Sequence, residues 1–363
     1  MRKITGFLFC QLAVFLLARC SSGPSFPYQA AITEGNRIVD SLLHAQQIPG
    51  IDAALAINGK VVWSQGFGYA DLEHQVPVKP GTTRFRIGSV SKPLTMAALG
   101  LLVDEGKVDV SEEVQAYVPF FPKKKYPITI KQVGGHLAGI RHYRDREFLS
   151  DKPYASVRQS LEIFDKDTLL FEPGTRYSYS SYGFNLLSVV IEEASGEDFL
   201  PFMQRKVFAP LKMFDTSPDK NDSIISNRSS FYHTDSLGET HNAPYVDNSY
   251  KWAGGGFLST TADLIRFGQA HLAPGFLSGQ TLKEFTTSQV LTNGDSTGYG
   301  MGWARLETSG IKGYGHTGGS VGGITAFRIY PQQQLILVLL SNSSNTSYGA
   351  IPDRIVKLFL DNQ

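Results

Sequence analysis

Cysteine is scarce in this chain of 363 residues, and its two cysteines, Cys10 and Cys20, both lie among the first twenty residues. A domain that begins after residue 20 therefore contains no internal disulfide, no zinc–thiolate site and no cysteine nucleophile. The sequence also lacks HExxH or a similar set of ligands, so we expect neither a metal ion nor another cofactor.

Charge of one sign is not in excess either. The 34 Lys and Arg residues balance 33 Asp and Glu residues, which leaves a formal net charge of +1. This balance gives no reason to expect a nucleic acid as partner, and the phosphate-binding pattern GxxxxGK[ST] is absent. A hydrophobic content of 42% with 18% charged residues is typical of a globular protein. The length allows one large domain or two closely packed ones.

The N-terminal residues contain a long apolar run. MRKITGFLFCQLAVFLLARC has a positive start and about 13 apolar residues, a pattern typical of a signal peptide over residues 1–20 and short for a membrane span. Residues 21–29 resemble a tether. The letters LARC resemble a bacterial lipoprotein box in which Cys20 is lipidated, although Arg19 is unusual there. A lipid tether, cleavage with release and an uncleaved anchor all stay open, and each predicts an extracytoplasmic location, periplasmic or membrane-anchored in a bacterium.

Patterns at the two ends of the chain predict a single antiparallel sheet. Residues 50–70 hold two apolar runs around Asn58-Gly59, the strongest short signal of a β-hairpin. Residues 324–342 contain two further strand-like runs joined by a turn at Pro331. Helical patterns occupy residues 30–47, 182–196, 261–272 and 351–360.

These patterns together predict an α+β fold for residues 30–363. We expect an antiparallel sheet subdomain built from about 30–105 and 291–363 and flanked by helices. A helical subdomain, about 106–290, is inserted between the two halves of the sheet.

A serine and a lysine three residues apart are found in RIGSVSKPLT, residues 86–95. Pro93 is tolerated only in the first turn of a helix, so it predicts a helix that begins at about Ser89. The residues that follow have helical spacing and end at a glycine: Met96, Leu99, Leu102 and Gly106. Residues three apart share a helix face, which sets Ser89 beside Lys92 and turns Ser91 away.

The S-x-x-K pattern is typical of a nucleophilic serine whose proton is taken by a lysine. Ser217–Lys220 and Ser309–Lys312 also match it, but they lie in a predicted loop and a predicted turn. Only Ser89 begins a helix, where unpaired NH groups stabilise developing negative charge. Lys92 must be neutral part of the time, which requires burial or a nearby cation.

Two other stretches are candidates for the same site. FEPGTRYSYSSYGFNLL places Tyr177, Tyr179 and Tyr182 before a helix, and on its own this pattern is best explained as an aromatic wall of the core. YGHTGGSVGG has five glycines in ten positions, so its backbone can approach another group closely. His316 at its start is able to donate to a substrate or exchange protons with it, and an ordinary glycine-rich turn is the alternative.

The order of GSVSK, YSS after a Pro-Gly turn, and HTGG resembles the active-site-serine beta-lactamase and penicillin-binding protein family. The likeness is strongest for its class C beta-lactamase, DD-peptidase and esterase branch. PYVDNSYKWAGGGFLST and HLAGIRHY look like the mitochondrial beta-lactamase-like serine protease and its bacterial relatives. The resemblance runs from about residue 30 to the end and implies the beta-lactamase/transpeptidase-like fold.

The resemblance also implies roles for individual residues. Ser89 corresponds to the acylated nucleophile, Lys92 to its base, and Tyr179 to the residue that moves protons to the leaving group and to water. His316 begins the HTG triplet on the strand along which an extended substrate lies. The implied substrate-binding residues are Ser181, Thr317, Gly318 and Gly319, and the NH groups of Ser89 and Gly319 form the implied oxyanion hole.

Two positions depart from the family pattern. Ser181 replaces the common asparagine, which removes an amide contact to the substrate. His316 replaces the commoner lysine, so positive charge at this position fades near neutral pH. We therefore expect weak recognition of substrate carboxylates and a limb in the pH–rate profile near the ordinary histidine pKa of about 6.5.

Three further features carry less weight. His136 and His142 fit no metal-ligand spacing, and a structural hydrogen bond is the expected role of His136. Gly254–Gly256 form either a loop near the cleft or a plain turn.

The sequence therefore predicts a serine hydrolase that forms an acyl-enzyme on a peptide or amide bond, with a peptide or peptidoglycan-like substrate. A beta-lactamase or esterase with the same nucleophile is the first alternative. A non-catalytic, filament-forming structural protein is the second, since relatives of the mitochondrial member assemble into filaments. The predicted partners also include further copies of this chain as a homo-oligomer or filament.

Overall fold

The computed structural model describes residues 28–362. The signal peptide and the lipidation site at Cys20 lie outside the described residues and stay predictions. Within residues 28–362, no helix is long and apolar enough to cross a membrane.

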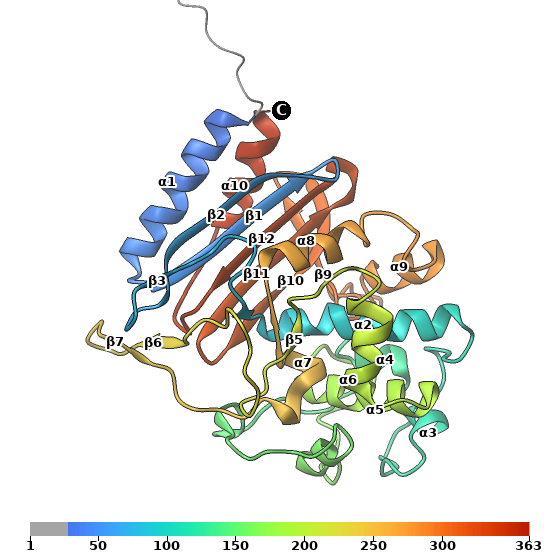
Figure 1. The fold of residues 1–363 in the computed structure, drawn as a ribbon. Helices are drawn as coiled ribbons and strands as arrows, with labels where there is room; N and C mark the ends of the chain where they lie inside the picture. Colours follow the sequence, from blue (N-terminus) through green and yellow to red (C-terminus); the bar gives the residue numbers. More distant parts are fainter. Residues whose placement is uncertain (1–27, 363) are drawn as a thin grey trace, which may run out of the picture.

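A seven-stranded antiparallel sheet joins the two ends of the chain (Figure 1). Its strands, in spatial order, are β3 (Val76–Pro77), β2 (Lys60–Asp71), β1 (Gly50–Ile57), β12 (Leu335–Ser341), β11 (Gly323–Tyr330), β10 (Ile311–Ser320) and β9 (Ala304–Thr308). The first and last long strands are central neighbours, with Ile51 opposite Ser341. The predicted α+β class with an antiparallel sheet from both chain ends is confirmed.

Both predicted hairpins are present. Asn58 and Gly59 have φ values of 51° and 76°, the left-handed pair that a two-residue type I′ turn between β1 and β2 requires. At the other end, Pro331 follows β11 and begins a short 3-10 helix before β12.

Alternate side chains of the central strands belong to two cores on opposite faces of the sheet. Leu335, Leu337 and Leu339 pack with α1 (Gln29–Ala45) and α10 (Ile351–Asp361), which lie side by side on one face (Figure 1). Ile336 and Val338 point to the other face and pack into the larger core. That core also contains the helices α8 (Thr261–Gln269) and α2 (Ser91–Asp104).

The middle of the chain contains short helices and loops rather than long helices alone. Its α-helices are α3 (Val114–Tyr117), α4 (Ile130–Gly134), α5 (Ser181–Ser195), α6 (Phe199–Met203), α7 (Trp252–Gly255) and α9 (Gly279–Thr286). Single turns of 3-10 or π-helix are Gly88–Val90, Glu147–Leu149, Gln159–Ile163, Gln204–Phe208, Ser249–Lys251 and Pro331–Gln333. Small strands are β4 (Phe85–Arg86), β5 (Ser217–Pro218), β6 (Tyr232–Thr234), β7 (Thr240–Asn242) and β8 (Phe257–Ser259).

The start of α2 differs in detail from the prediction. The α-helix begins at Ser91, and Ser89 lies in a 3-10 turn, Gly88–Val90, that leads into it. Gly88 has a φ of 50°, and an added Cβ there would be 2.5 Å from the carbonyl oxygen of Gly319. This close approach to β10 bends the chain before the helix, because only glycine fits the conformation and the space.

Replacing Leu337 with alanine should destabilise the domain strongly. Its side chain is fully buried in the core beneath α1 and α10, so Leu337→Ala should lower the free energy of unfolding by about 2–5 kcal/mol. Leu237→Ala is the matched control, because Leu237 is 83% exposed and should cost less than about 0.5 kcal/mol. Urea unfolding followed by fluorescence measures both changes, and equal losses would contradict the assigned core.

Candidate active site

The serine and lysine of the S-x-x-K motif are hydrogen-bond partners. Lys92 Nζ lies 3.1 Å from Ser89 Oγ, and Ser89 is half-buried and borders a cavity. Ser91 is fully buried, and its hydroxyl accepts a hydrogen bond from the Phe257 NH at 3.3 Å. The geometry therefore presents Ser89 to a substrate and turns Ser91 into the core.

Lys92 has three hydrogen-bond partners from three separate segments. Its Nζ contacts Ser89 Oγ at 3.1 Å, Ser181 Oγ at 3.0 Å and the Gly254 carbonyl oxygen at 2.6 Å. A protonated amine donates to all three. A neutral amine donates to two of them and accepts the Ser89 proton with its lone pair. Both protonation states are therefore satisfied without movement of the side chain.

Burial lowers the pKa of Lys92 well below its ordinary value of 10.5, and the positive charge of Lys251 lowers it further. Lys92 is fully buried, and among residues 28–362 no carboxylate lies within 4 Å of its amine. Desolvation disfavours the charged form. A neutral amine beside a hydroxyl is the state that a general base requires.

Tyr179 lies directly before α5 and faces the same pair. Its ring centroid is 4.8 Å from Lys92 Nζ. Burial raises the pKa of Tyr179, and a hydrogen bond with Ser89 opposes that rise. Ser180 caps α5 by accepting the Gly183 NH at 3.2 Å, which fixes the position of the preceding tyrosine.

The His136 ring packs against the Tyr179 ring. The two ring centroids are 4.3 Å apart, and His136 Nδ1 accepts the backbone NH of Ser180 at 3.2 Å. Burial lowers the pKa of His136 well below 6.5, so the ring is neutral. The predicted structural hydrogen bond is confirmed.

The HTGG motif forms part of a free strand edge. β9 pairs with β10 only from Ile311 to Gly315, and residues 316–320 pair with β11 on their other side. Thr317 and Gly319 are exposed. An added Cβ on Gly318 would lie 1.9 Å from the Ile87 carbonyl oxygen and 3.2 Å from Ser89 N. Glycine is therefore required where this edge meets the turn that carries Ser89.

His316 is buried, and both of its ring nitrogens are occupied. Nδ1 contacts the Thr317 carbonyl oxygen, which can only accept. The proton is therefore assigned to Nδ1, and Nε2 accepts the Tyr299 hydroxyl at 2.9 Å. Burial, together with the charge of Lys92, lowers the pKa of His316 to about 3. With its pKa lowered and both ring nitrogens hydrogen-bonded, we expect the ring to stay neutral, which argues against the limb expected near 6.5.

One cavity of about 290 Å³ collects most of the predicted residues. It is lined by Ser89, His142, Tyr143, Phe148, Tyr179, Ser181, Lys251, Gly254, Gly255, His316, Thr317 and Gly319. Lys92 lies behind Ser89, and Gly318 packs against Ile87. Gly254 and Gly255 border the cavity, as the first alternative expected, but they lie in the short helix α7, which Gly256 caps, rather than in a loop.

Sequence reasoning missed His142, Tyr143, Phe148 and Lys251 as cavity residues. His142 Nδ1 accepts the Ser181 NH at 3.1 Å, and burial lowers its pKa to about 4. These residues occur within or beside HLAGIRHY and NSYKWAGGG, so the recognisable stretches themselves were the available signal. Loops bring these four residues together, and the conformation of a loop cannot be predicted from a periodic sequence pattern.

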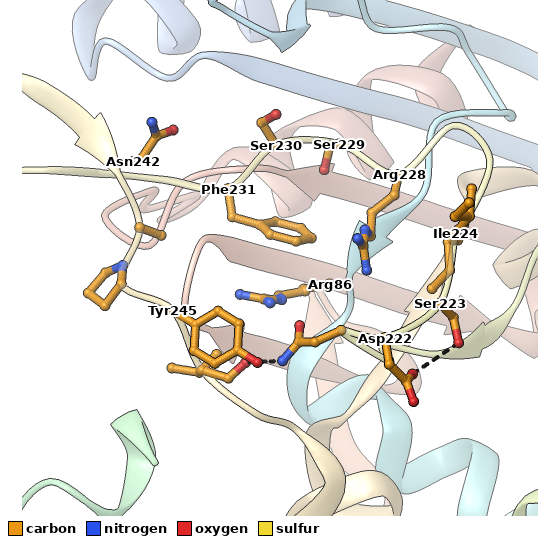
Figure 2. A pocket seen from close by; sticks show the side chains of 15 residues that line it. Arg86, Asp222, Ser223, Ile224, Arg228, Ser229, Ser230, Phe231, Asn242 and Tyr245 are labelled. Carbon is orange, nitrogen blue, oxygen red and sulfur yellow. Dashed lines mark hydrogen bonds between the residues drawn. The ribbon is translucent and has the colours of Figure 1, made fainter. Parts of the chain in front are cut away.

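A second cavity of about 770 Å³ lies at Arg86 (Figure 2). The Arg86 guanidinium packs 3.8 Å from the centroid of the Phe231 ring and binds Asp219 through Nε at 2.6 Å. Arg228 and Tyr245 also line this space (Figure 2). The nucleophile borders the smaller cavity, so size does not identify the reactive site here.

The antiparallel fold and the paired serine and lysine define the class of beta-lactamase-fold serine hydrolases. The Beta-lactamase family profile matches residues 36–360, and the chain belongs to this family. It is 34% identical to mouse "Serine beta-lactamase-like protein LACTB, mitochondrial", covering 85% of this chain and 76% of that protein. It is 31% identical to Bacillus subtilis "Penicillin-binding protein 4*", covering 81% and 68%.

Solved structures share the fold. The octameric penicillin-binding protein homologue from Pyrococcus abyssi superposes with a TM-score of 0.79 at 24% identity, over 92% of this chain and 78% of that one. The D-amino acid amidase from Ochrobactrum anthropi SV3 gives 0.78 at 22% identity, over 91% and 100%. The predicted family and fold are confirmed.

The reactivity of Ser89 should increase with pH through the lowered pKa of Lys92, because only the neutral amine accepts the serine proton. We expect the ascending limb well below pH 10.5. Lys251→Met removes a neighbouring positive charge, so it should raise the Lys92 pKa and move this limb to higher pH. The measurement is the pH dependence of the rate constant for fluorophosphonate labelling of Ser89.

His316→Gln is the control for this assignment. Because the His316 ring is neutral, the substitution should change the rate without moving the limb. A limb near pH 6.5 that disappears in His316→Gln would show that the histidine titrates in the reaction after all.

Proposed function

We propose that this protein is a serine hydrolase that cleaves a peptide or amide bond through an acyl-enzyme. The observation that carries the proposal is the 3.1 Å contact between Ser89 Oγ and the amine of a fully buried lysine. Because burial favours the neutral form of the Lys92 amine, this amine is able to accept the proton of the Ser89 hydroxyl.

The first half-reaction transfers an acyl group to the serine. Lys92 Nζ takes the proton of Ser89 while Oγ bonds to the substrate carbonyl carbon, and the carbonyl electron pair moves to its oxygen. The tetrahedral intermediate collapses, the C–N bond breaks, and the leaving amine takes a proton from Tyr179. The Lys92 ammonium then reprotonates Tyr179 through the Ser181 hydroxyl, which is hydrogen-bonded to Lys92 at 3.0 Å and to Tyr179.

The second half-reaction releases the acid. Water attacks the acyl carbonyl carbon and gives a proton to the neutral amine of Lys92, while the Tyr179 hydroxyl stays protonated. The bond between that carbon and Ser89 Oγ breaks, and the serine oxygen takes the proton back. Atoms and charges balance without a cofactor.

The free edge of β10 suits an extended substrate. Residues 316–320 leave backbone groups on one side unpaired by any described strand, and an extended peptide is able to pair with such an edge. We assign the oxyanion hole to the backbone NH groups of Ser89 and Gly319. The close approach of Gly318 to Ser89 N supports this assignment.

A peptide or other amide is the favoured substrate. Amide hydrolases share the fold, including the D-amino acid amidase and a D-stereospecific amidohydrolase from Streptomyces. Ser181 Oγ bonds to Lys92, so it does not offer the substrate the amide contact of an asparagine. Beta-lactam hydrolysis and ester hydrolysis use the same nucleophile and are the near alternatives. EstCE1, described as a hydrolase with promiscuous acyltransferase activity, shares the fold.

Location and assembly also belong to the proposal. We expect an extracytoplasmic enzyme that acts on peptide or peptidoglycan-like material, with Cys20 as the candidate lipid anchor. An octameric relative of the same fold favours self-association as well. A purely structural, filament-forming protein is the competing hypothesis.

Intact-mass spectrometry after exposure to a fluorophosphonate or a penicillin tests the nucleophile. The wild-type protein should gain the mass of one covalent adduct. Ser89→Ala should lose the adduct and lower kcat/KM on any hydrolysed amide by about a thousandfold or more.

Ser91→Ala is the matched control two residues away and should keep the adduct. An adduct that survives in Ser89→Ala but not in Ser91→Ala would reverse the assignment. A wild-type protein that forms no adduct with either reagent and turns over no substrate would favour the structural alternative.

A further inference from the structure

Lys251 is a buried lysine whose amine has no hydrogen-bond partner among residues 28–362, and burial together with the charge of Arg86 lowers its pKa to about 7. Its side chain is 2% exposed and lines the same cavity as Ser89. Among residues 28–362, no group accepts a hydrogen bond from its Nζ, and no carboxylate lies within 4 Å of it. Instead, aromatic rings surround the amine, with centroids at 4.3 Å for Phe148, 5.1 Å for Tyr250 and 5.8 Å for Tyr143.

Asp219 is the carboxylate whose charge raises the pKa of Lys251, but its oxygens are already bound by other side chains. Asp219 is buried, and its oxygens bind Arg86 Nε at 2.6 Å, Asn248 Nδ2 at 2.9 Å and Arg228 Nη1 at 3.4 Å. Two guanidinium groups thus share one carboxylate, which leaves the charge of Lys251 without compensation in this part of the chain.

The cavity lining carries no negative charge of its own, because none of the described residues that line it is Asp or Glu. Glu147, beside Phe148, forms an ion pair with Arg141 at 2.7 Å. Lys251 is therefore the lining residue that gives this small cavity positive character when its amine is protonated.

We propose that Lys251 binds a carboxylate of the substrate and makes the enzyme selective for anionic substrates. An unpaired buried ammonium loses its hydration without replacement, and a carboxylate restores both charge and hydrogen bonds. When a carboxylate reaches Nζ, the contact with the Phe148 ring gives way to an ion pair. This inference rests on the proposed function, since it names the substrate class of the same site.

The histidine at position 316 cannot provide the positive charge that would bind a substrate carboxylate. Position 316 holds a histidine whose ring is buried and fully hydrogen-bonded, so it offers no positive charge to a substrate. Lys251 lines the same cavity from the turn directly before α7. The proposal thus assigns to Lys251 the carboxylate recognition that the sequence prediction expected to be weak at position 316.

The cavity size limits where the carboxylate can be. At about 290 Å³, the space is at the lower end of ligand pockets, which span about 300–1,000 Å³. Ser89 and Lys251 both line this small space, so a carboxylate held by the lysine is close to the bond that the serine attacks. The carboxylate therefore lies within one residue of the bond, either as the free C-terminus of the leaving group or on the acyl side.

Two matched substrate pairs test the inference and separate these two positions. N-acetyl-D-alanyl-D-alanine and its C-terminal amide differ only in the leaving-group carboxylate. N-acetyl-D-aspartyl and N-acetyl-D-asparaginyl p-nitroanilide differ only in a carboxylate against an amide on the acyl side. The wild-type enzyme should prefer the anionic member of one pair by about tenfold or more in kcat/KM, and about 1.4 kcal/mol corresponds to that factor.

Substitution of the lysine should remove this preference. Lys251→Met and Lys251→Gln should each bring the preference below about threefold, mainly through KM, while Lys251→Arg should keep part of it. Lys152→Met removes an exposed lysine and should leave the preference unchanged. Because each preference is a ratio within one enzyme preparation, loss of folded protein does not alter it.

The outcomes distinguish this inference from the proposed function. Fluorophosphonate labelling of Ser89 without a preference for an anionic substrate in either pair would overturn the role of Lys251 and leave the hydrolase proposal intact. A preference that persists in both neutral variants would also overturn it. Failure of Ser89 to label, with no turnover of any of the four substrates, would reject the hydrolase proposal itself.

Discussion

The burial of one amine organises the whole site. Lys92 is inaccessible to solvent, and its Nζ is held by Ser89, Ser181 and Gly254 from three different segments. Removing an ammonium from water is costly, and three directed hydrogen bonds at one nitrogen fix its position. The start of α2, the start of α5 and the turn of α7 are therefore locked together around the group that must accept a proton.

The sheet provides the second half of the site by bringing a free backbone edge to the serine. β10 extends past the end of β9, so residues 316–320 are left unpaired on one side by the described strands. Gly88 and Gly318 let this edge and the turn before α2 approach more closely than side chains would permit. The glycine-rich HTGG sequence is thus a packing requirement first, and the exposed edge follows from it.

Much of the site could be predicted from short patterns. The spacing of Ser89 and Lys92 follows from helical geometry, and the hairpin at Asn58-Gly59 follows from turn chemistry. The place of Tyr179 was identified only through resemblance to a family, because its local pattern fits an aromatic core equally well. His316 lines the cavity, but its hydrogen bond with Tyr299 and the lowering of its pKa could not be predicted, since both depend on residues distant in sequence.

The sequence by itself determined the two hairpins, the five longest helices of the described residues, the spacing of Ser89 and Lys92, and the absence of cysteine chemistry after residue 20. These properties depend on neighbours within one or two turns, so local periodicity is enough to reveal them. Only the tertiary structure decided which side chains share the cavity and which are charged. Lys251, His142 and Phe148 arrive on irregular segments, and desolvation is set by everything packed around a group rather than by the residues beside it in the chain.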